Sequence, residues 1–322
     1  ANRLCCLARL VQELDARSYG QISRVLILTR GAWVIGGDCA PASLYGAAAW
    51  GFGRTLALEH LELSAVLVDV DPAGYEPGME TLASYLCSTS HEGQFAVRGS
   101  KVLVPRLMRQ SLGQQADVPL RNDAAYLVTG GLGNLGLRVA KWLVERGARH
   151  LVLMSRNALP PRSSWSALDP SSETGRRIAG VLDAESRGAS VQVVSVDVAD
   201  GHALEAWLAQ HRQEMRPQIR GVVHAAGVVM RSPALDVGPD QVRQQLAAKL
   251  VGAMTLDRLF ADDELDAFVL FSSASAVLAS PGLAAYAASN SVLDAVASTR
   301  RARGGQALSI QWSGWAGGGM AQ

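Results

Sequence analysis

The chain has 322 residues, which is the length of about two domains. Hydrophobic residues make up 48% and charged residues 18%, so the composition predicts a large core and excludes a disordered tail. The 30 basic and 29 acidic residues leave a net charge of +1, which argues against a nucleic-acid binder with a broad basic face.

No membrane span is visible in the sequence. No apolar stretch reaches the roughly 18 residues of a spanning helix without a charge or a turn-forming residue. The cysteines Cys5, Cys6, Cys39 and Cys87 lack metal-ligand spacing, and the adjacent pair is poorly placed for a disulfide. We therefore expect reduced, buried thiols, no metal site, and a cytoplasmic protein without membrane or nucleic-acid partners.

The first half of the chain alternates predicted strands with predicted helices. Its apolar and helical patterns predict strands over 24–29, 65–69, 95–98 and 101–105 and helices over 41–60 and 79–87. Such alternation predicts a parallel sheet with helices packed on it, the last two strands pairing at its edge. No glycine-rich loop follows the first strand, so we expect a nucleotide-binding type of fold that holds no nucleotide.

Residues 111–123 are polar and contain Gly and Pro, as a linker does. Beyond them the alternation restarts, with strands predicted over 126–129, 151–154, 191–196, 221–224, 268–271 and 308–311 and helices over 135–146, 176–187, 202–210, 239–259 and 284–303. This pattern predicts a complete doubly wound dinucleotide-binding fold. We expect an α/β chain of two Rossmann-like subdomains, with a truncated structural one over 1–112, a linker over 113–124 and a complete one over 125–322.

A glycine-rich turn joins the first strand and the first helix of this second half. Glycines in such a turn let the backbone approach a pyrophosphate at the helix N-terminus, although a tight structural turn is the alternative. The cofactor-binding residues expected here are Thr129, Gly130, Gly131, Leu132, Gly133, Asn134, Leu135 and Gly136.

The end of the next predicted strand bears on which cofactor binds. An NAD-binding fold often has an acid about 20 residues after the glycines, where this chain has Ser155 and Arg156. A hydroxyl and a guanidinium suit a 2′-phosphate, so NADPH is favoured over NADH. The alternative is that Arg156 is an ordinary solvated loop charge.

Two later strand ends complete the expected cofactor site. Asp197, followed by Val198, is as good a candidate for a hydrogen bond to the adenine as for a helix cap. Small residues after the next strand would let the chain pass beneath the cofactor, and they are Ala225, Ala226 and Gly227. His224 precedes them, and we expect it to be structural rather than a catalytic base.

The strongest candidates for catalysis are Lys249, Ser273, Tyr286 and Asn290. Tyr286 and Asn290 are four residues apart in a predicted helix, so they share one face. Hydride reduction of a carbonyl needs a proton donor at the developing oxyanion, and a phenol with its ordinary pKa near 10 is a poor acid unless a cation lowers that pKa. Lys249 would supply the cation, and Ser273 a second donor. Taken alone, each of the four has an ordinary structural explanation.

Together these motifs resemble the short-chain dehydrogenase/reductase superfamily and, within it, the ketoreductase domains of modular polyketide synthases. The segments that carry the resemblance are 129–136, 155–156, 224–227, Lys249 with 252–253, 272–273, 286–290 and 312–315. Residues 48–60 resemble a helix of that family's structural subdomain, which binds no cofactor. The resemblance therefore implies that the second subdomain is a catalytic, NADPH-binding reductase.

For this chain the resemblance implies NADPH-dependent reduction of a β-ketoacyl thioester. The substrate would be carried on the phosphopantetheine arm of an acyl carrier protein, and the neighbouring synthase domains would be further partners. The pro-S hydride would pass to the β-carbon while Tyr286 protonates the oxygen and Ser273 polarises it. Lys249 would hold the nicotinamide ribose, Tyr286 would also contact the cofactor, and Asn290 would help to order a water relay.

Two other functions stay open at this point. One is a free-standing reductase of a diffusible ketone, which has little use for a cofactor-free half. The other is a non-catalytic domain that binds NADPH or packs against its neighbours, although the lysine, serine and tyrosine are all retained.

The chain also departs from the family pattern. One stereochemical class carries Leu-Asp-Asp where this chain has residues 229–231 (Val-Met-Arg), and the other carries a tryptophan where it has Leu278. A common glutamine is replaced by Leu283. The product configuration stays open, with a slight preference for the class without Leu-Asp-Asp.

The reductases that this chain resembles continue beyond the last strand into a lid helix. We expect the lid to be missing from the second subdomain, which here stops at Gln322. Gly317–Gly319 are as consistent with a lid hinge as with an ordinary flexible terminus.

Overall fold

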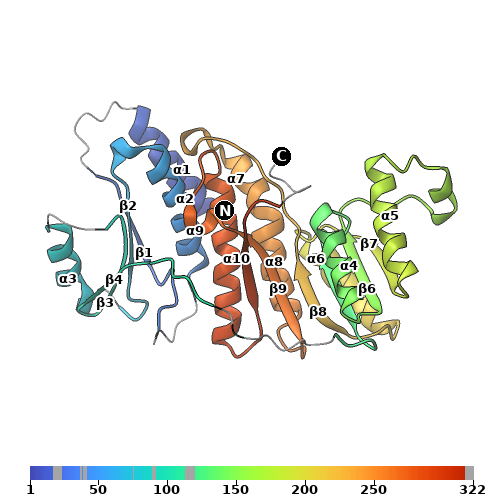
Figure 1. Ribbon diagram of the computed structural model, residues 1–322. Helices are drawn as coiled ribbons and strands as arrows, with labels where there is room; N and C mark the ends of the chain where they lie inside the picture. Colours follow the sequence, from blue (N-terminus) through green and yellow to red (C-terminus); the bar gives the residue numbers. More distant parts are fainter. Residues whose placement is uncertain are drawn as a thin grey trace. The chain divides into compact units, whose positions relative to one another are not determined.

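The computed structural model describes residues 1–16, 24–36, 38, 42–74, 76–88, 92–111, 113 and 120–315, and its strands form two sheets (Figure 1). The first sheet has the order β1-β2-β3-β4, in which β1, β2 and β3 are parallel and β4 pairs antiparallel with β3. The elements of this region are α1 (Asn2–Ala16), β1 (Leu26–Arg30), α2 (Leu44–Glu59), the 3₁₀ turn η1 (Leu61–Leu63), β2 (Val66–Val70), α3 (Glu76–Leu86), β3 (Gln94–Arg98) and β4 (Lys101–Leu103).

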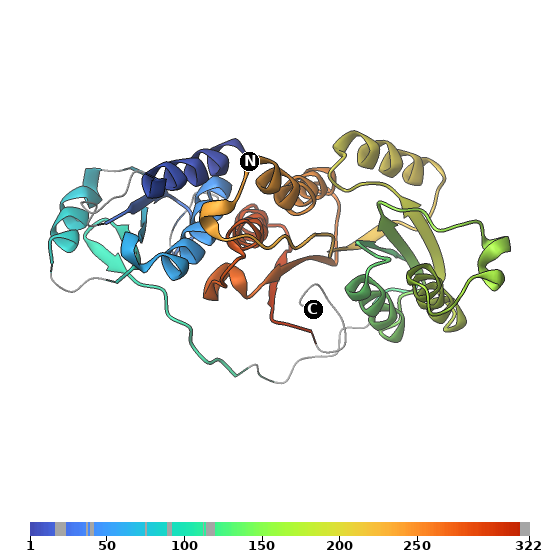
Figure 2. The same ribbon diagram turned by 90° about the horizontal axis from the view of Figure 1, so that it is seen from above.

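The strands and helices predicted for this region are confirmed, with three differences. The helix expected from residue 41 begins at Leu44, because the Ser43 side chain accepts a hydrogen bond from Gly46 N and caps it there. The two strands predicted to pair at the edge do pair, but β3 lies inside the sheet and only β4 is an edge strand. Helix α1 was not predicted, and it packs against α2 and α7 (Figure 2).

The second sheet has six strands in the order β10-β9-β8-β5-β6-β7, and β5 to β9 pair in parallel. The order reverses at β5, which is the topological switch point where doubly wound sheets bind ligands. Its strands are β5 (Ala125–Thr129), β6 (His150–Ser155), β7 (Ser190–Ser195), β8 (Ile219–His224), β9 (Ala267–Ser273) and β10 (Leu308–Trp312). The α/β class with two Rossmann-like subdomains is confirmed.

Helices connect the strands of the second sheet, and one of them differs from its prediction. The helix expected over 239–259 is interrupted by a π-helical turn that carries Lys249. The helices and turns of this part are α4 (Asn134–Glu145), η2 (Arg162–Ala167), α5 (Glu173–Ser186), α6 (Gly201–Gln213), η3 (Ala234–Asp236), α7 (Pro239–Leu246), the π turn η4 (Ala247–Val251), α8 (Gly252–Leu259), α9 (Ser275–Leu278) and α10 (Ala284–Ala302). A core of residues from β5, β6, α4 and α5, including Tyr126, Leu143, Leu153 and Val181, packs between α4, α5 and the sheet.

Contacts divide the chain into two compact units, neither of which is continuous in sequence. Unit 1 comprises Ala1–Gln114, Val229–Leu246 and Ser272–Gly305, and unit 2 comprises Gln115–Val228, Ala247–Phe271 and Gln306–Gln322. Unit 1 therefore contains α7, α9 and α10 in addition to the first sheet. The subdomain limits over 1–112, 113–124 and 125–322 stay a prediction. Each unit is described by itself below.

Helix α2 lies at the centre of unit 1, between the first sheet and α10. A Cβ added to Gly53 would meet Leu67 of β2 at 2.5 Å, and a Cβ added to Gly51 would meet the Ala287 backbone oxygen of α10 at 2.5 Å. The two glycines thus allow close contact on two sides of one helix. This explains why α2 is buried over most of its length and how it supports α10.

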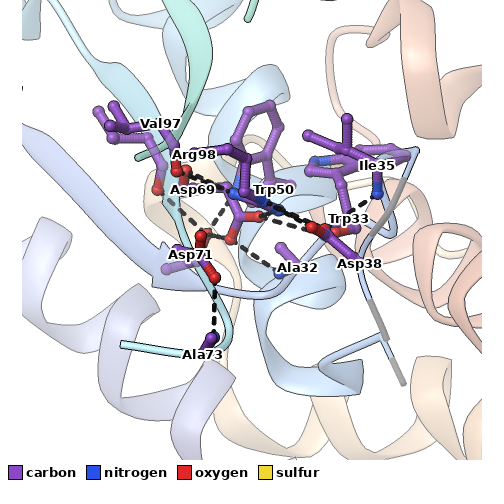
Figure 3. A network of polar contacts seen from close by, with 12 residues as sticks. Ala32, Trp33, Ile35, Asp38, Trp50, Asp69, Asp71, Ala73, Val97 and Arg98 are labelled. Atoms are coloured by element: carbon purple, nitrogen blue, oxygen red, sulfur yellow. Dashed lines mark hydrogen bonds and ion pairs between the residues drawn. The ribbon is translucent and has the colours of Figure 1, made fainter. Parts of the chain in front are cut away.

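At the carboxyl ends of β1 and β2, a network of side chains closes the first sheet (Figure 3). Asp69, fully buried, accepts hydrogen bonds from Thr29 Oγ1 at 2.8 Å and Ala32 N at 2.7 Å. It also pairs with Arg98 Nη2 at 2.8 Å, and Arg98 Nε binds Asp38 at 3.1 Å. Burial opposes the charge of Arg98, but hydrogen bonds and attraction from the two carboxylates outweigh it and raise its pKa.

Surface and composition predictions have mixed outcomes. Buried cysteines were expected, which is right for Cys5 but wrong for Cys6 and Cys87, whose side chains are exposed and free. Cys39 and Gly317–Gly319 lie outside the described residues. Within the described ranges no helix is long and apolar enough to cross a membrane, and the same ranges hold no cluster of His, Cys, Asp and Glu suited to a metal ion.

Candidate active site

A cleft of about 870 Å³ opens in unit 2 at the carboxyl ends of β5, β6, β7 and β8. Among the predicted cofactor-binding residues, those that line it are Thr129, Gly130, Leu132, Gly133, Asn134, Leu135, Gly136, Ser155, Arg156, Asp197, Val198, Ala225, Ala226 and Gly227. Gly131 does not line it, because this residue faces β6, where an added Cβ would lie 2.8 Å from Leu153 Cα. These are 14 of the 23 lining residues, and Lys249 and Tyr286, which were also expected to contact the cofactor, are not among the 23. That the lining binds a cofactor stays a prediction.

The glycine-rich turn is built for close backbone contact. Gly130 has φ +68°, and a Cβ there would lie 2.9 Å from the backbone of Ala226. A Cβ on Gly136 would overlap the carbonyl oxygen of Gly130. Helix α4 begins at Asn134, and its cap residue Gly133 supplies no side-chain hydrogen bond to the first turn. The first residues of α4 line the cleft, and no cap side chain takes up their backbone N–H groups, which suits a pyrophosphate.

The far end of the cleft is rich in hydrogen-bond donors. Arg156 is exposed at the end of β6, beside Ser155. Sequence reasoning missed Asn157, Arg176 and Arg177, which line the same cleft. The two arginines lie in α5, and no local motif marks them. Glu173 lines the cleft as well and pairs with Arg177, so Arg156 and Arg176 are the cations of this group that suit a phosphate.

Asp197 lines the cleft and also has a structural role. Its Oδ1 accepts a hydrogen bond from Ala199 N at 2.9 Å. The helix that follows is capped by a different residue, because Asp200 accepts from Ala203 N. Asp197 is thus not the helix cap that was one of its two predicted roles, and contact with the adenine stays a prediction.

His224 is buried at the end of β8, as a structural histidine should be. Its Nδ1 lies 2.7 Å from Thr129 Oγ1 in a hydrogen bond. Burial, helped by repulsion from Lys249, lowers the pKa of His224 to about 3, so the ring is neutral at physiological pH. The ring also packs beside Gly252, at the start of α8. This burial and this hydrogen bond are consistent with a structural His224, and the expectation that it is not a catalytic base stays a prediction.

Lys249 lies in the π turn η4, with 3% of its surface exposed. Its Nζ donates a hydrogen bond to the Phe271 carbonyl oxygen at 2.8 Å. A Cβ on Gly227 would lie 2.9 Å from Lys249 Cε, so the absent side chain makes room for the lysine. π turns are rare and often occur at functional sites. The buried amine is thus held in unit 2, next to the cleft-lining residue Gly227.

The other three candidate catalytic residues come together in unit 1. Ser273 ends β9, and Tyr286 and Asn290 lie in α10. Burial raises the pKa of Tyr286, while hydrogen bonds from the side chains of Asn290 and Ser273 act to lower it. The net effect of this surrounding protein is a raised pKa, so the phenol is protonated at neutral pH. A lowering of the Tyr286 pKa by Lys249 stays a prediction.

Asn290 is fully buried and fixed from two sides. Its Nδ2 donates a hydrogen bond to the Tyr286 backbone oxygen at 2.8 Å, and the Asn290 backbone oxygen accepts a hydrogen bond from Ser272 Oγ at 3.2 Å. The second bond ties the end of β9 to α10. Ser273 is the next residue, so the bond holds the end of β9 that carries it against α10.

Comparison with known proteins agrees with this geometry. The family model for the KR domain matches residues 124–317, and the model for the "Polyketide synthase extender module SpnB, Rossmann fold domain" matches residues 4–107. The chain belongs to the ketoreductase domain family of polyketide synthases. These domains are oxidoreductases of the short-chain dehydrogenase/reductase type.

Similar proteins support the assignment over the whole chain. One subunit of the phenolphthiocerol/phthiocerol polyketide synthase of Mycobacterium tuberculosis is 37% identical over 100% of this chain, which spans 17% of that relative. A structure described as "A-type Ketoreductases from Modular Polyketide Synthase" has a TM-score of 0.86 and 35% identity, covering 99% of this chain and 64% of the other. The ketoreductase from the first module of phoslactomycin biosynthesis in Streptomyces sp. HK803 has a TM-score of 0.85 and 34% identity, covering 99% and 70%.

Proposed function

We propose that this chain reduces a β-ketoacyl thioester to the β-hydroxyacyl thioester with NADPH during polyketide biosynthesis. The observation that carries the proposal is that unit 1 places Ser273, at the end of β9, with Tyr286 and Asn290 of α10, in a chain of the ketoreductase family. The side chains of Ser273 and Asn290 both act to lower the pKa of Tyr286. A protonated phenol with a second hydroxyl beside it is what a developing alkoxide requires.

The cleft in unit 2 fits a dinucleotide with a 2′-phosphate. The turn at Gly130 and the uncapped first turn of α4 suit the pyrophosphate, and Ser155 and Arg156 suit the phosphate on the adenosine ribose. When bound, NADPH supplies the hydride for the β-carbon, the pro-S hydride by family resemblance. Lys249 would hold the nicotinamide ribose through its buried amine. Preference for NADPH over NADH is supported by Arg156 and Arg176 in the cleft lining and by the absence of an acid directly after β6.

The residues of unit 1 would transfer a proton to the substrate. Tyr286 donates its proton to the β-oxygen, and Ser273 donates a hydrogen bond to the same oxygen. Lys249 lowers the pKa of Tyr286 during the reaction, offsetting the rise that burial causes. Asn290 helps to order the water relay that returns a proton to the phenol.

Partners and location follow from the family. The curated relatives are multidomain synthases. This chain spans 17% of the length of the first of them. We propose that neighbouring synthase domains flank it, that an acyl carrier protein presents the substrate on its phosphopantetheine arm, and that the protein works in the cytoplasm.

Replacement of the proton donor tests this function. Tyr286→Phe should lower turnover of a carrier-bound 2-methyl-3-keto thioester at least ~100-fold, the usual scale for a positioned general acid, with NADPH affinity unchanged. Loss of cofactor absorbance gives the rate, and fluorescence titration gives the affinity. Tyr45→Phe is the matched control, because Tyr45 is an exposed tyrosine on α2. Near-normal turnover in the Tyr286 variant would refute the proposal.

A further inference from the structure

Glu59, the last residue of α2, binds two loops that are far from it in sequence. Its Oε2 accepts a hydrogen bond from Ala234 N at 2.6 Å, and its Oε1 accepts one from Gly282 N at 2.6 Å. Hydrogen bonds to an ionised carboxylate are short and about twice as strong as neutral ones. One carboxylate thus joins the 229–236 segment to the 279–283 segment, and all of these residues belong to unit 1.

The two segments also bind each other directly. Ser232 pairs with Leu283 in a parallel bridge, and Ser232 N donates to the Gly282 oxygen at 2.9 Å. Gly282 is therefore bound through both its N–H and its carbonyl group. Ala234 is fully buried at the start of η3, whose cap residue Pro233 offers no side-chain hydrogen bond. Without Glu59, the buried N–H of Ala234 would lose its partner.

The 279–283 segment has a strained backbone that needs such support. Ala279 has φ +57° and Gly282 has φ +72°. A non-glycine residue at positive φ is costly and persists only where its surroundings fix it. Helix α2 supplies a second link just before this segment, because the buried Arg54 donates through Nη1 to the Ala276 oxygen of α9. Arg54 and Glu59 thus hold the chain on either side of Ala279.

By resemblance to the family, the first segment contains one stereochemical fingerprint position and the second directly follows the other. By that resemblance, residues 229–231 replace one stereochemical fingerprint, Leu278 replaces the tryptophan of the other, and Leu283 replaces a common glutamine. Gly282 lies four residues before Tyr286, which is in the first turn of α10. A shift of either segment would change how the substrate meets the tyrosine hydroxyl.

We infer that Glu59 is a positioning residue that fixes the 229–236 and 279–283 segments relative to each other and thereby sets the face on which the ketone is reduced. This inference rests on the proposed function for its stereochemical part. It also gives the first half of the chain a specific role, because α2 holds the loop that precedes Tyr286 and the loop that lies beside it.

Hydrogen exchange tests the positioning without any need for activity. In the full chain, Glu59→Ala should speed exchange of the Ala234 and Gly282 amides about tenfold or more, since both lose their acceptor. Glu62→Ala is the matched control, because its exposed carboxylate pairs with His60 instead. Unchanged exchange at both amides in Glu59→Ala would overturn the inference.

Product analysis tests the stereochemical part. With a carrier-bound 2-methyl-3-keto thioester, Glu59→Ala and Glu59→Gln should change the ratio of product diastereomers by about threefold or more, while the NADPH dissociation constant stays within about twofold. Leu82→Ala, in the core of the first sheet, controls for general destabilisation and should keep the wild-type ratio. An unchanged ratio in the Glu59 variants would refute the stereochemical role. No reduction by wild type would instead refute the proposed function, and the exchange experiment would still decide the positioning.

Discussion

Each of the two sheets has a threonine near a strand end that binds a buried side chain of the neighbouring strand. In the first sheet Thr29 of β1 is paired in register with Asp69 of β2, and its hydroxyl binds that buried carboxylate. In the second sheet Thr129 of β5 is paired in register with His224 of β8, and its hydroxyl binds that buried imidazole. Each threonine lies near the carboxyl end of a parallel strand, where such folds bind ligands.

What lies beyond the threonine differs between the sheets. In the first sheet, Asp69 forms an ion pair with Arg98 and accepts a hydrogen bond from the backbone N–H of Ala32, so ionic and polar contacts occupy the strand ends (Figure 3). In the second, His224 is neutral and a cleft lies beside the glycine-rich turn. In the first sheet, carboxylates accept hydrogen bonds from the backbone and side-chain donors at the strand ends, which suits a structural role. In the second sheet, the glycine-rich turn lets the backbone line a cleft, which suits ligand binding.

The largest expected effect comes from breaking the closed end of the first sheet. Asp69→Ala should cost about 3–5 kcal/mol of unfolding free energy, because it leaves buried donors of Arg98 and Ala32 without their acceptor. Urea denaturation measures this loss. Asp71→Ala, which removes an exposed bond to Ala73 N, should cost much less. Equal losses in the two variants would contradict the role of the network.

Acid should weaken the second sheet through His224. Its pKa of about 3 lies below the ordinary value, so the folded chain holds a neutral ring where the unfolded chain takes up a proton. This contribution is fully present above about pH 6.5 and is lost as the pH falls towards 3. Unfolding free energy should drop by roughly 2 kcal/mol between about pH 7 and about pH 5 from this group.

The slope with pH identifies the responsible histidine. His224→Gln should lose this part of the pH dependence, whereas His202→Gln, exposed on α6, should keep it. Denaturant titrations at the two pH values provide the comparison. The same slope in wild type and His224→Gln would mean that another group is responsible.

The open cleft predicts a cofactor effect of intermediate size. Arg156→Ala should weaken NADPH binding about tenfold or more and leave NADH nearly unchanged, since only NADPH has the phosphate that loses a charged partner. Dissociation constants for both cofactors measure the difference. Arg162→Ala is the control, because Arg162 pairs with Glu185 and does not line the cleft. Equal weakening of both cofactors would assign Arg156 a structural role.

The smallest effect concerns the two threonines themselves. Thr29→Val and Thr129→Val should each cost about 1 kcal/mol of unfolding free energy, the usual value of one buried hydrogen bond. Thr29 also accepts a bond from Trp50 Nε1 at 2.8 Å, so its variant should lose more than the Thr129 variant. Thermal and urea unfolding give the values, and a larger loss for the Thr129 variant would contradict the contribution of the Trp50 bond.

Much of this molecule follows from local sequence. The strands of both sheets, the turn at Gly130 and 14 of the 23 cleft-lining residues were predicted, because apolar periodicity and glycine spacing act over a few residues. Tyr286 and Asn290 were placed on one helix face by their spacing alone. The assignment of His224 as structural also followed from its position at a strand end.

Other features were decided only by tertiary structure. A continuous helical pattern concealed the π turn at Lys249, and nothing in α5 marked Arg176 and Arg177 as lining the cleft. Glu59 and Gly282 are 223 residues apart, and their hydrogen bond exists because α2 packs against α10. Local patterns determine which elements form, since they depend on neighbouring residues. Which side chain meets which distant backbone group depends on how those elements pack, and no local pattern records that.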